Sequence, residues 1–182
     1  MKRTLQLQMI FAAGLFAQND APSFVNEATI QAPLEAVWNV WTTGEGYKAL
    51  GVAKADIDFR VGGLIRSHYK ETGVLGDEDT IVNRILAYEP RRMIAIRIDK
   101  PPKGFPFKEA WKKTWTVVTM TDLGGKGTHM RIASMGFESD EESAAMRRFF
   151  EVGNDAVLKA LQAHFGRDGA NLRGLRAIVA AR

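Results

Sequence analysis

The sequence predicts an α+β fold in which a curved antiparallel sheet wraps around one long C-terminal helix. Three observations lead to this prediction. Apolar residues recur at three- and four-residue spacing from Asp140 to His164, which is typical of an amphipathic helix. Residues 53–137 read as consecutive short strands with turns between them. Two short helical segments precede those strands, and helices that are segregated from strands in this way belong to the α+β class.

The N-terminal part of this region predicts one strand and two short helices. The sequence FVNEATI at 24–30 is the first strand. Pro33 then opens a helix over 34–43, because proline fits the start of a helix, and Val37, Trp38 and Trp41 form its apolar face. A second helical turn is expected from Gly46 to Leu50.

The middle of the chain predicts six further strands. Alternation of apolar and polar residues, as in Ala55, Ile57 and Phe59, indicates strands with one solvated face. Gly62-Gly63 and Gly124–Gly127 mark turns. Pro101, Pro102, Gly104 and Pro106 mark a loop of about ten residues, long enough to act as a lid. The predicted strands cover residues 53–60, 64–71, 79–88, 92–98, 113–121 and 128–135.

The long helix carries signals at its start and along one face. Ser139 or Asp140 can cap it, and acidic residues fill its first turn, where the helix dipole favours negative charge. Gly153-Asn154 weakens helix propensity in the interior. This pair indicates either close backbone packing, which we favour, or a polar anchor for a ligand. The predicted apolar face comprises Met146, Phe149, Phe150, Gly153, Val157, Ala160, Leu161 and His164.

Composition excludes several classes of function. The chain has 182 residues, 46% of them hydrophobic and 25% charged, and it has no cysteine, so disulfides and thiolate chemistry are absent. A net charge of +4 that is dispersed along the chain does not indicate nucleic-acid binding. The three histidines do not have the spacing of metal ligands. The sequence therefore predicts no metal and no cofactor, and it makes no prediction of oligomeric state.

Both ends of the chain carry segments outside the predicted domain, which spans 23–165. Residues 1–22 resemble a signal peptide with a short linker, because Lys2 and Arg3 precede a short apolar run. That run is too short for a stable membrane span. Export to the periplasm or the medium is the expectation if the leader is cleaved; the alternative is a cytoplasmic protein with an N-terminal extension. The basic tail 166–182 is either an amphipathic segment or, as we favour, a simple appendage.

Several segments, taken in order, resemble a known superfamily. They are APLEAVWNVWTTGEGYKALG, ADIDFRVGG, YEPRRMIAIRI, GTHMRIASMGF and the long helix. Together they resemble the START-like superfamily, also called SRPBCC or Bet v 1-like, over about residues 24–165. The branch is similar to the C-terminal domain of the activator of heat-shock protein 90 ATPase. The resemblance implies a helix-grip fold of six or seven strands and an internal cavity for lipids, polyketides, sterols or other apolar molecules.

Large apolar residues on the elements around the expected cavity are the candidates for ligand binding. With two polar residues, they form the predicted set of Trp41, Phe59, Arg97, Trp115, Met146, Phe149, Phe150 and Asn154. The alternative for the apolar members is plain core packing, which we favour for Trp38 and Val157. His129 and Arg131 are expected to face solvent, because alternation turns Met130 and Ile132 inward.

Three functions follow as hypotheses. The first is the binding of a small hydrophobic molecule, without a defined reaction. The second is an enzyme resembling polyketide cyclases or dehydratases, for which His68 and Tyr69 are the candidate acid or base. The third is a protein resembling activators of a chaperone ATPase.

Overall fold

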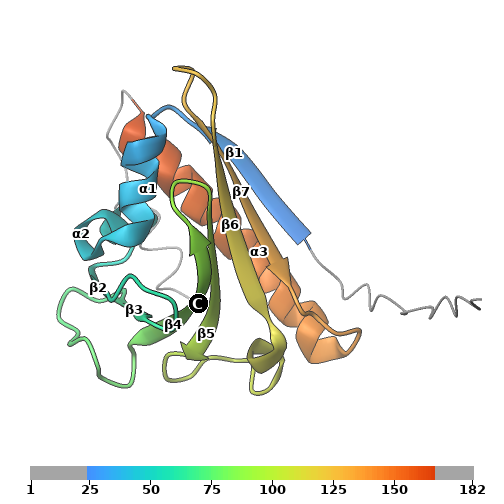
Figure 1. Cartoon of the computed structure of the whole chain (residues 1–182). Coiled ribbons are helices and arrows are strands. Elements are labelled where there is room, and N and C mark those ends of the chain that lie inside the picture. Colours follow the sequence, from blue (N-terminus) through green and yellow to red (C-terminus); the bar gives the residue numbers. More distant parts are fainter. Residues whose placement is uncertain (1–23, 167–182) are drawn as a thin grey trace, which may run out of the picture.

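A seven-stranded antiparallel sheet and a long helix make up the domain in the computed structural model, which describes residues 24–166 (Figure 1). The predicted leader, and the predicted tail from residue 167 onward, lie outside the described residues. The strand order is β1-β7-β6-β5-β4-β3-β2. The strands are β1 (Phe24–Ile30), β2 (Lys54–Ile57), β3 (Leu64–His68), β4 (Ile81–Glu89), β5 (Met93–Lys100), β6 (Trp115–Asp122) and β7 (Thr128–Met135). The helices are α1 (Leu34–Thr42), α2 (Gly44–Tyr47), η1 (Lys48–Leu50), η2 (Ala110–Lys113) and α3 (Glu141–Phe165).

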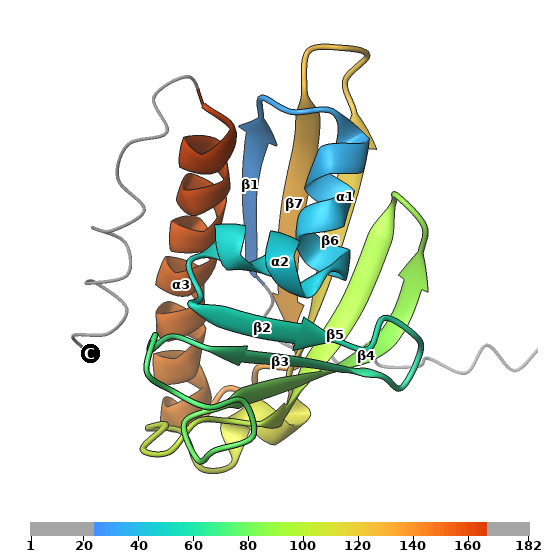
Figure 2. The same ribbon diagram turned by 90° about the vertical axis from the view of Figure 1, so that its left-hand side faces the viewer.

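The α+β helix-grip fold is therefore confirmed. α3 packs against β1, η1 and η2, while α1 and α2 lie together over the sheet (Figure 2). The Asp140 carboxylate caps α3 by accepting the Ser143 N–H at 2.9 Å, as the sequence predicted for one of its two candidate caps. Two details of the predicted apolar face are wrong. His164 is exposed at the helix end, and Leu158, which the spacing did not select, is buried.

Several predicted strands end earlier than expected. β3 ends at His68 rather than continuing to Glu71. The His68 ring accepts the Lys70 N–H at 2.9 Å, so this N–H is not free to bond to a neighbouring strand. β2 ends at Ile57, since the Arg60 N–H turns back to the Asp58 carbonyl. A single 3₁₀ turn, η2, precedes β6 where the sequence predicted loop and strand.

Two separate apolar clusters hold α3 in place. The larger one joins α1, η1 and the inner face of the sheet to Leu158 and Leu161 in the C-terminal half of the helix. The smaller one joins Phe24, Ala110 and Phe137 to Met146 near the helix start. α3 is thus fixed against the sheet near both ends. Between these contacts the helix belongs to neither cluster, although Phe150 packs against the smaller cluster and Val157 against the larger one.

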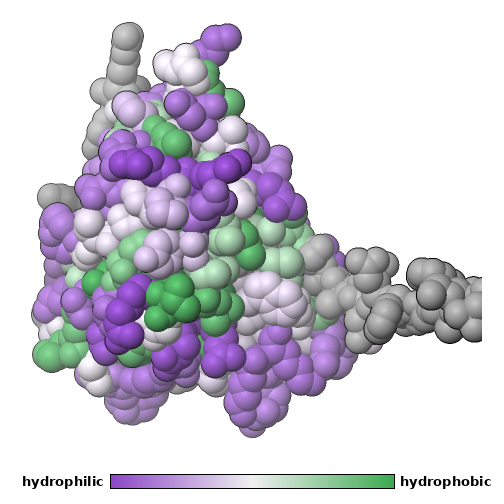
Figure 3. All heavy atoms as spheres, viewed as in Figure 1, coloured by the Kyte–Doolittle hydropathy of each residue, from purple (hydrophilic) through white to green (hydrophobic). Residues whose placement is uncertain are grey.

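The opposite face of the sheet is solvated. In β7, Met130 and Ile132 are buried, while His129 and Arg131 lie near Glu27 on the other face, which confirms the predicted orientation. Charged and apolar residues are mixed on the face seen in Figure 1, where strands lie in front of α3 (Figure 3). Among residues 24–166, no helix is both long and apolar enough to cross a bilayer.

Candidate ligand-binding cavity

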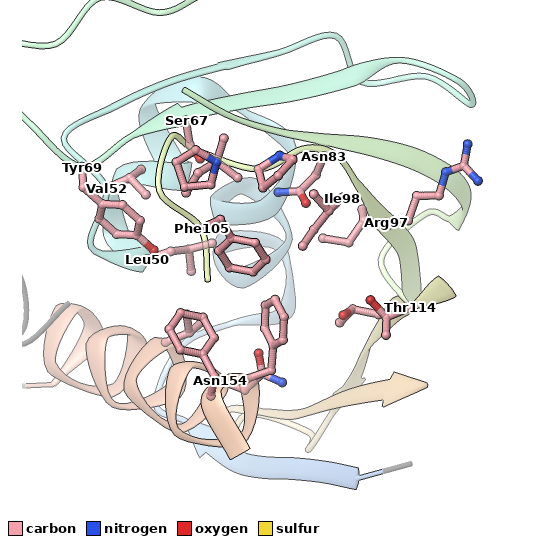
Figure 4. Close-up of a pocket in the computed structure, with 18 of the residues that line it drawn as sticks. Leu50, Val52, Ser67, Tyr69, Asn83, Arg97, Ile98, Phe105, Thr114 and Asn154 are labelled. Atoms are coloured by element: carbon pink, nitrogen blue, oxygen red, sulfur yellow. The ribbon is translucent and has the colours of Figure 1, made fainter. Parts of the chain in front are cut away.

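A cavity of about 510 Å³ lies between the sheet and the middle of α3. Its volume is within the range of small-molecule sites, roughly 300–1,000 Å³. The cavity occupies the length of helix that neither apolar cluster fills, so it follows from the way in which α3 is held near both ends. Most of its lining comes from four parts of the fold, and Tyr69, Lys70 and Asp79 from the loop after β3 complete it (Figure 4).

The first wall comes from the short helices and the second from the sheet. Trp41, Tyr47 and Leu50 belong to α1, α2 and η1, and an edge-to-face contact of 6.0 Å between ring centroids holds the Tyr47 ring against Trp41. The floor is formed by strand residues that alternate inward, among them Ile96 and Ile132. Aliphatic and aromatic groups therefore dominate the wall from the short helices, whereas the floor mixes apolar with polar side chains.

The third wall is the Pro-rich loop, and the fourth is α3. Phe105 extends from the loop and lies at ring-centroid distances of 5.9 Å from Phe149 and 6.4 Å from Phe150. Phe107 lies 5.3 Å from Phe105 and 5.6 Å from Phe149. Phe149 is 39% exposed, so this set of four rings, the Phe cluster, stands at the boundary between cavity and solvent. We interpret the Phe cluster as the entrance to the cavity.

A short polar chain crosses the floor beside α3. The Asn154 side-chain amide donates to the Ser134 hydroxyl at 3.1 Å, and the Thr116 hydroxyl lies 3.4 Å from the same oxygen. The predicted preference for close packing at Gly153-Asn154 is wrong, since a β-carbon at Gly153 would have no heavy atom within 4 Å. Asn154 instead lines the cavity, and its role as a polar anchor for a ligand stays a prediction.

The other predicted ligand-binding residues divide into three groups. Trp41, Trp115, Phe149 and Phe150 line the cavity. Phe59 does not, because it packs between Trp38 and Tyr88, and Met146 is fully buried in the smaller cluster. Arg97 belongs to the wall, but its guanidinium points away from the cavity (Figure 4). Val157, which we interpreted as core, both packs on the larger cluster and lines the cavity.

His68 and Tyr69, the candidate acid or base, have different surroundings. Nδ1 of His68 accepts the Lys70 N–H, Nε2 lies 3.3 Å from the Asp77 carboxylate, and the ring packs on Gly73. Both ring nitrogens thus face the loop 69–80, where His68 holds the chain in place. The Tyr69 hydroxyl points into the cavity (Figure 4), and burial raises the pKa of this phenol.

Tyr47 and Phe105 are among the cavity residues that sequence reasoning missed. Tyr47 belongs to a helix of four residues, and Phe105 to a loop, so neither shows a periodic pattern. Within residues 24–166, no three His, Asp or Glu side chains are grouped so that they could hold a metal ion.

The fold and cavity define a helix-grip protein of the START-like superfamily. More specifically, the chain belongs to the family described as activator of Hsp90 ATPase homolog 1-like protein, whose model matches residues 31–166. A comparison with curated proteins gave no match.

Solved structures share the fold at low sequence identity. A protein from Mesorhizobium loti has a TM-score of 0.61 and 19% identity, over 78% of this chain and 94% of that one. The Aha1 dimer from Colwellia psychrerythraea has a TM-score of 0.58 and 15% identity, over 81% and 98%. CalU16 from Micromonospora echinospora has a TM-score of 0.57 and 18% identity, over 88% and 87%. At these identities the likeness concerns the fold alone.

Proposed function

We propose that this chain binds a small hydrophobic molecule in the cavity between the sheet and α3, without catalysing a reaction on it. The observation that carries the proposal is the apolar cavity of about 510 Å³ between the two clusters that anchor the helix. Burying an apolar ligand there removes both ligand and wall from water, which supplies about 25 cal/mol per Å² of apolar surface.

The geometry gives less support to the enzyme hypothesis. An acid or base must come within hydrogen-bond reach of a bound substrate. The nitrogens of His68 are turned towards Lys70 and Asp77, so of the two candidates Tyr69 alone directs its polar atom into the cavity. Chaperone activation stays a prediction that rests on the family description.

The test fills the cavity from α3 and measures binding of the uncharged fluorescent probe N-phenyl-1-naphthylamine. Val157 lines the cavity, whereas Val152 lies on the same helix, is 53% exposed and is not part of the wall. We expect Val157→Trp to weaken probe binding at least about tenfold, because the indole occupies ligand space, and Val152→Trp to leave it unchanged.

Circular dichroism and thermal melting establish that both variants are folded. A wild-type chain that does not bind the probe, or a folded Val157→Trp variant that binds it as tightly as wild type, would contradict the proposed function.

A further inference from the structure

Two polar side chains on the inner face of β3 and β4 line the cavity without a hydrogen-bond partner among residues 24–166. Ser67 is only 3% exposed, and its hydroxyl is unpaired within this part of the chain. The Asn83 amide points into the same cavity (Figure 4) and is likewise unpaired within the described residues. A ligand that displaces water from such groups without replacing its hydrogen bonds loses affinity.

The register of the sheet places these two side chains next to one another. Ser67 lies opposite Ile81, and Asn83 lies opposite Ile65, in the antiparallel pairing of β3 with β4. All four residues therefore share one face of the sheet, the face on which Ile65 is fully buried. Diagonal neighbours of this kind lie about 7–8 Å apart, so one small ligand group between Ser67 and Asn83 can contact both.

The other polar groups of the wall are placed differently. The Asn154 amide is already bonded to Ser134. Nε1 of Trp41 has no partner, but this atom is buried rather than open to the cavity. The hydroxyls of Tyr47 and Tyr69 come from α2 and from the loop after β3, so the strand register does not fix their distance from the pair on β3 and β4.

The charged groups of the cavity wall are engaged with one another or directed elsewhere. Lys70 pairs with Asp79 at 2.5 Å, and Lys103 pairs with Glu78 at 2.7 Å. The Arg97 guanidinium points away from the cavity (Figure 4). A charged ligand group beside β4 would lose its hydration without gaining a counter-charge, which is unfavourable in an apolar site. The group that fits this position is therefore neutral.

The chemistry of the pair indicates which neutral group fits best. An asparagine amide presents an N–H donor and a carbonyl acceptor side by side, whichever way round the amide is oriented. A ligand group that only accepts, such as a ketone, leaves the Asn83 carbonyl without a donor. A carboxamide supplies both functions and can form two parallel hydrogen bonds with Asn83, while the Ser67 hydroxyl donates to the second lone pair of the ligand's carbonyl oxygen.

We propose that Asn83, together with Ser67, binds the amide group of an uncharged and otherwise apolar carboxamide or lactam. The hydrocarbon body of the ligand then lies along the apolar walls towards the Phe cluster. This inference rests on the proposed function, because it names the chemical class of the molecule that the cavity binds.

The test compares naphthalene probes that differ in one substituent, by displacement of N-phenyl-1-naphthylamine. 2-Naphthamide and 2-acetonaphthone have nearly the same shape, because an amino group in one replaces a methyl group in the other, and 2-naphthoate is an anion. We expect wild type to bind the amide at least as tightly as the ketone, although the amide loses more hydration, and to bind the anion most weakly.

The variants separate the two hydrogen-bonding roles. Asn83→Leu should lower the ratio of amide affinity to ketone affinity about tenfold, because the amide N–H of the ligand loses its acceptor. Ser67→Ala should weaken both probes about threefold, because the hydroxyl serves the carbonyl that both share. Asn83→Val, which suits a strand, replaces Asn83→Leu in the test if circular dichroism shows that the leucine variant is unfolded.

Asn39→Leu is the matched control, since Asn39 is exposed on α1 and is not part of the cavity wall. It should leave the affinity ratio unchanged. A wild type that prefers the ketone or the anion, or a ratio that stays the same in a folded Asn83 variant, would overturn the inference while the binding function stands. If wild type binds neither the naphthalene probes nor the fluorescent reporter, both proposals fall.

Discussion

His68 and Asp77 show how single residues fix the long loop after β3. The Asp77 carboxylate accepts the N–H groups of Val74 and Asp79 and the hydroxyl of Thr80, at 3.0 to 3.1 Å. The buried ring of His68 also lies beside this carboxylate, with Nε2 at 3.3 Å from it. The loop that borders the cavity is therefore held by a network centred on one carboxylate rather than by apolar burial.

This network predicts an acid-sensitive contribution to stability. The pKa of Asp77 lies below its ordinary value of 3.8, chiefly because the carboxylate accepts the Val74 N–H, with Thr80, His68 and Asp79 adding to the effect. A lowered pKa in the folded state stabilises the fold at pH values above 3.8, and this stabilisation is lost as the pH falls through the folded-state pKa.

We expect Asp77→Asn to be less stable than wild type at about pH 6, and the difference to narrow towards about pH 3, as measured by urea unfolding. Asp155→Asn is the control, because the Asp155 carboxylate lies in an exposed ion pair with Lys159, and such pairs contribute little. A gap between wild type and Asp77→Asn that is constant across this range would contradict the assignment.

At the scale of elements, α3 carries a glycine that its surroundings do not require. Gly153 has ordinary helical geometry, and a β-carbon there would meet no heavy atom within 4 Å. Glycine is less favourable than alanine in a helix interior because it loses more backbone entropy on folding.

Gly153→Ala should therefore raise the free energy of unfolding by about 0.5–1 kcal/mol, as measured by chemical denaturation. Gly46→Ala in α2 serves as the contrasting control. A β-carbon at Gly46 would stand 2.4 Å from the Asn39 carbonyl oxygen, so this variant should be destabilised. A destabilised Gly153→Ala variant would show that the glycine has a role in packing after all.

Long periodic elements could be predicted from the sequence more closely than most short ones, although the short helical turn predicted at Gly46–Leu50 coincides with α2 and η1. β1 and β7 match their predicted ranges residue for residue, and α3 differs by one residue at each end. β3 was predicted too long because its end depends on the His68 ring binding its own chain, which no periodicity reveals. η2 was not predicted either, because it is a single turn without a side-chain cap and shows no periodic pattern.

At the scale of the whole molecule, the cavity is a consequence of how the core is divided. Side chains from α3 were predicted as candidates for the cavity because helical spacing selects a face. Phe59 and Met146 were also predicted to line the cavity because they are large and apolar, but both pack in the apolar clusters instead. Which apolar residues border empty space depends on the relative position of α3 and the sheet, and this is a property of the assembled fold.

The Phe cluster predicts control over the rates of ligand exchange. Phe105 bridges the Pro-rich loop to Phe149 and Phe150, so its removal opens the entrance while leaving the inner walls in place. Phe105→Ala should speed release of N-phenyl-1-naphthylamine by about tenfold in stopped-flow fluorescence, with a smaller change in Kd because entry is also faster.

Leu123→Ala, an exposed leucine beside the β6–β7 turn, is the control and should leave both rates unchanged. Unchanged release from the Phe105→Ala variant would indicate that ligands enter by another route.

The pairing of β1 with β7 has a consequence for how the chain is made. Phe24 lies opposite Ser134 and Ile30 opposite Thr128, so the first strand to leave the ribosome finds its neighbour only after every other strand has been synthesised. Pairings between such distant segments slow folding, because a large loop must close before they form. We therefore expect the nascent sheet to assemble from its middle hairpins outwards, with β1 as the last of the described strands to be added.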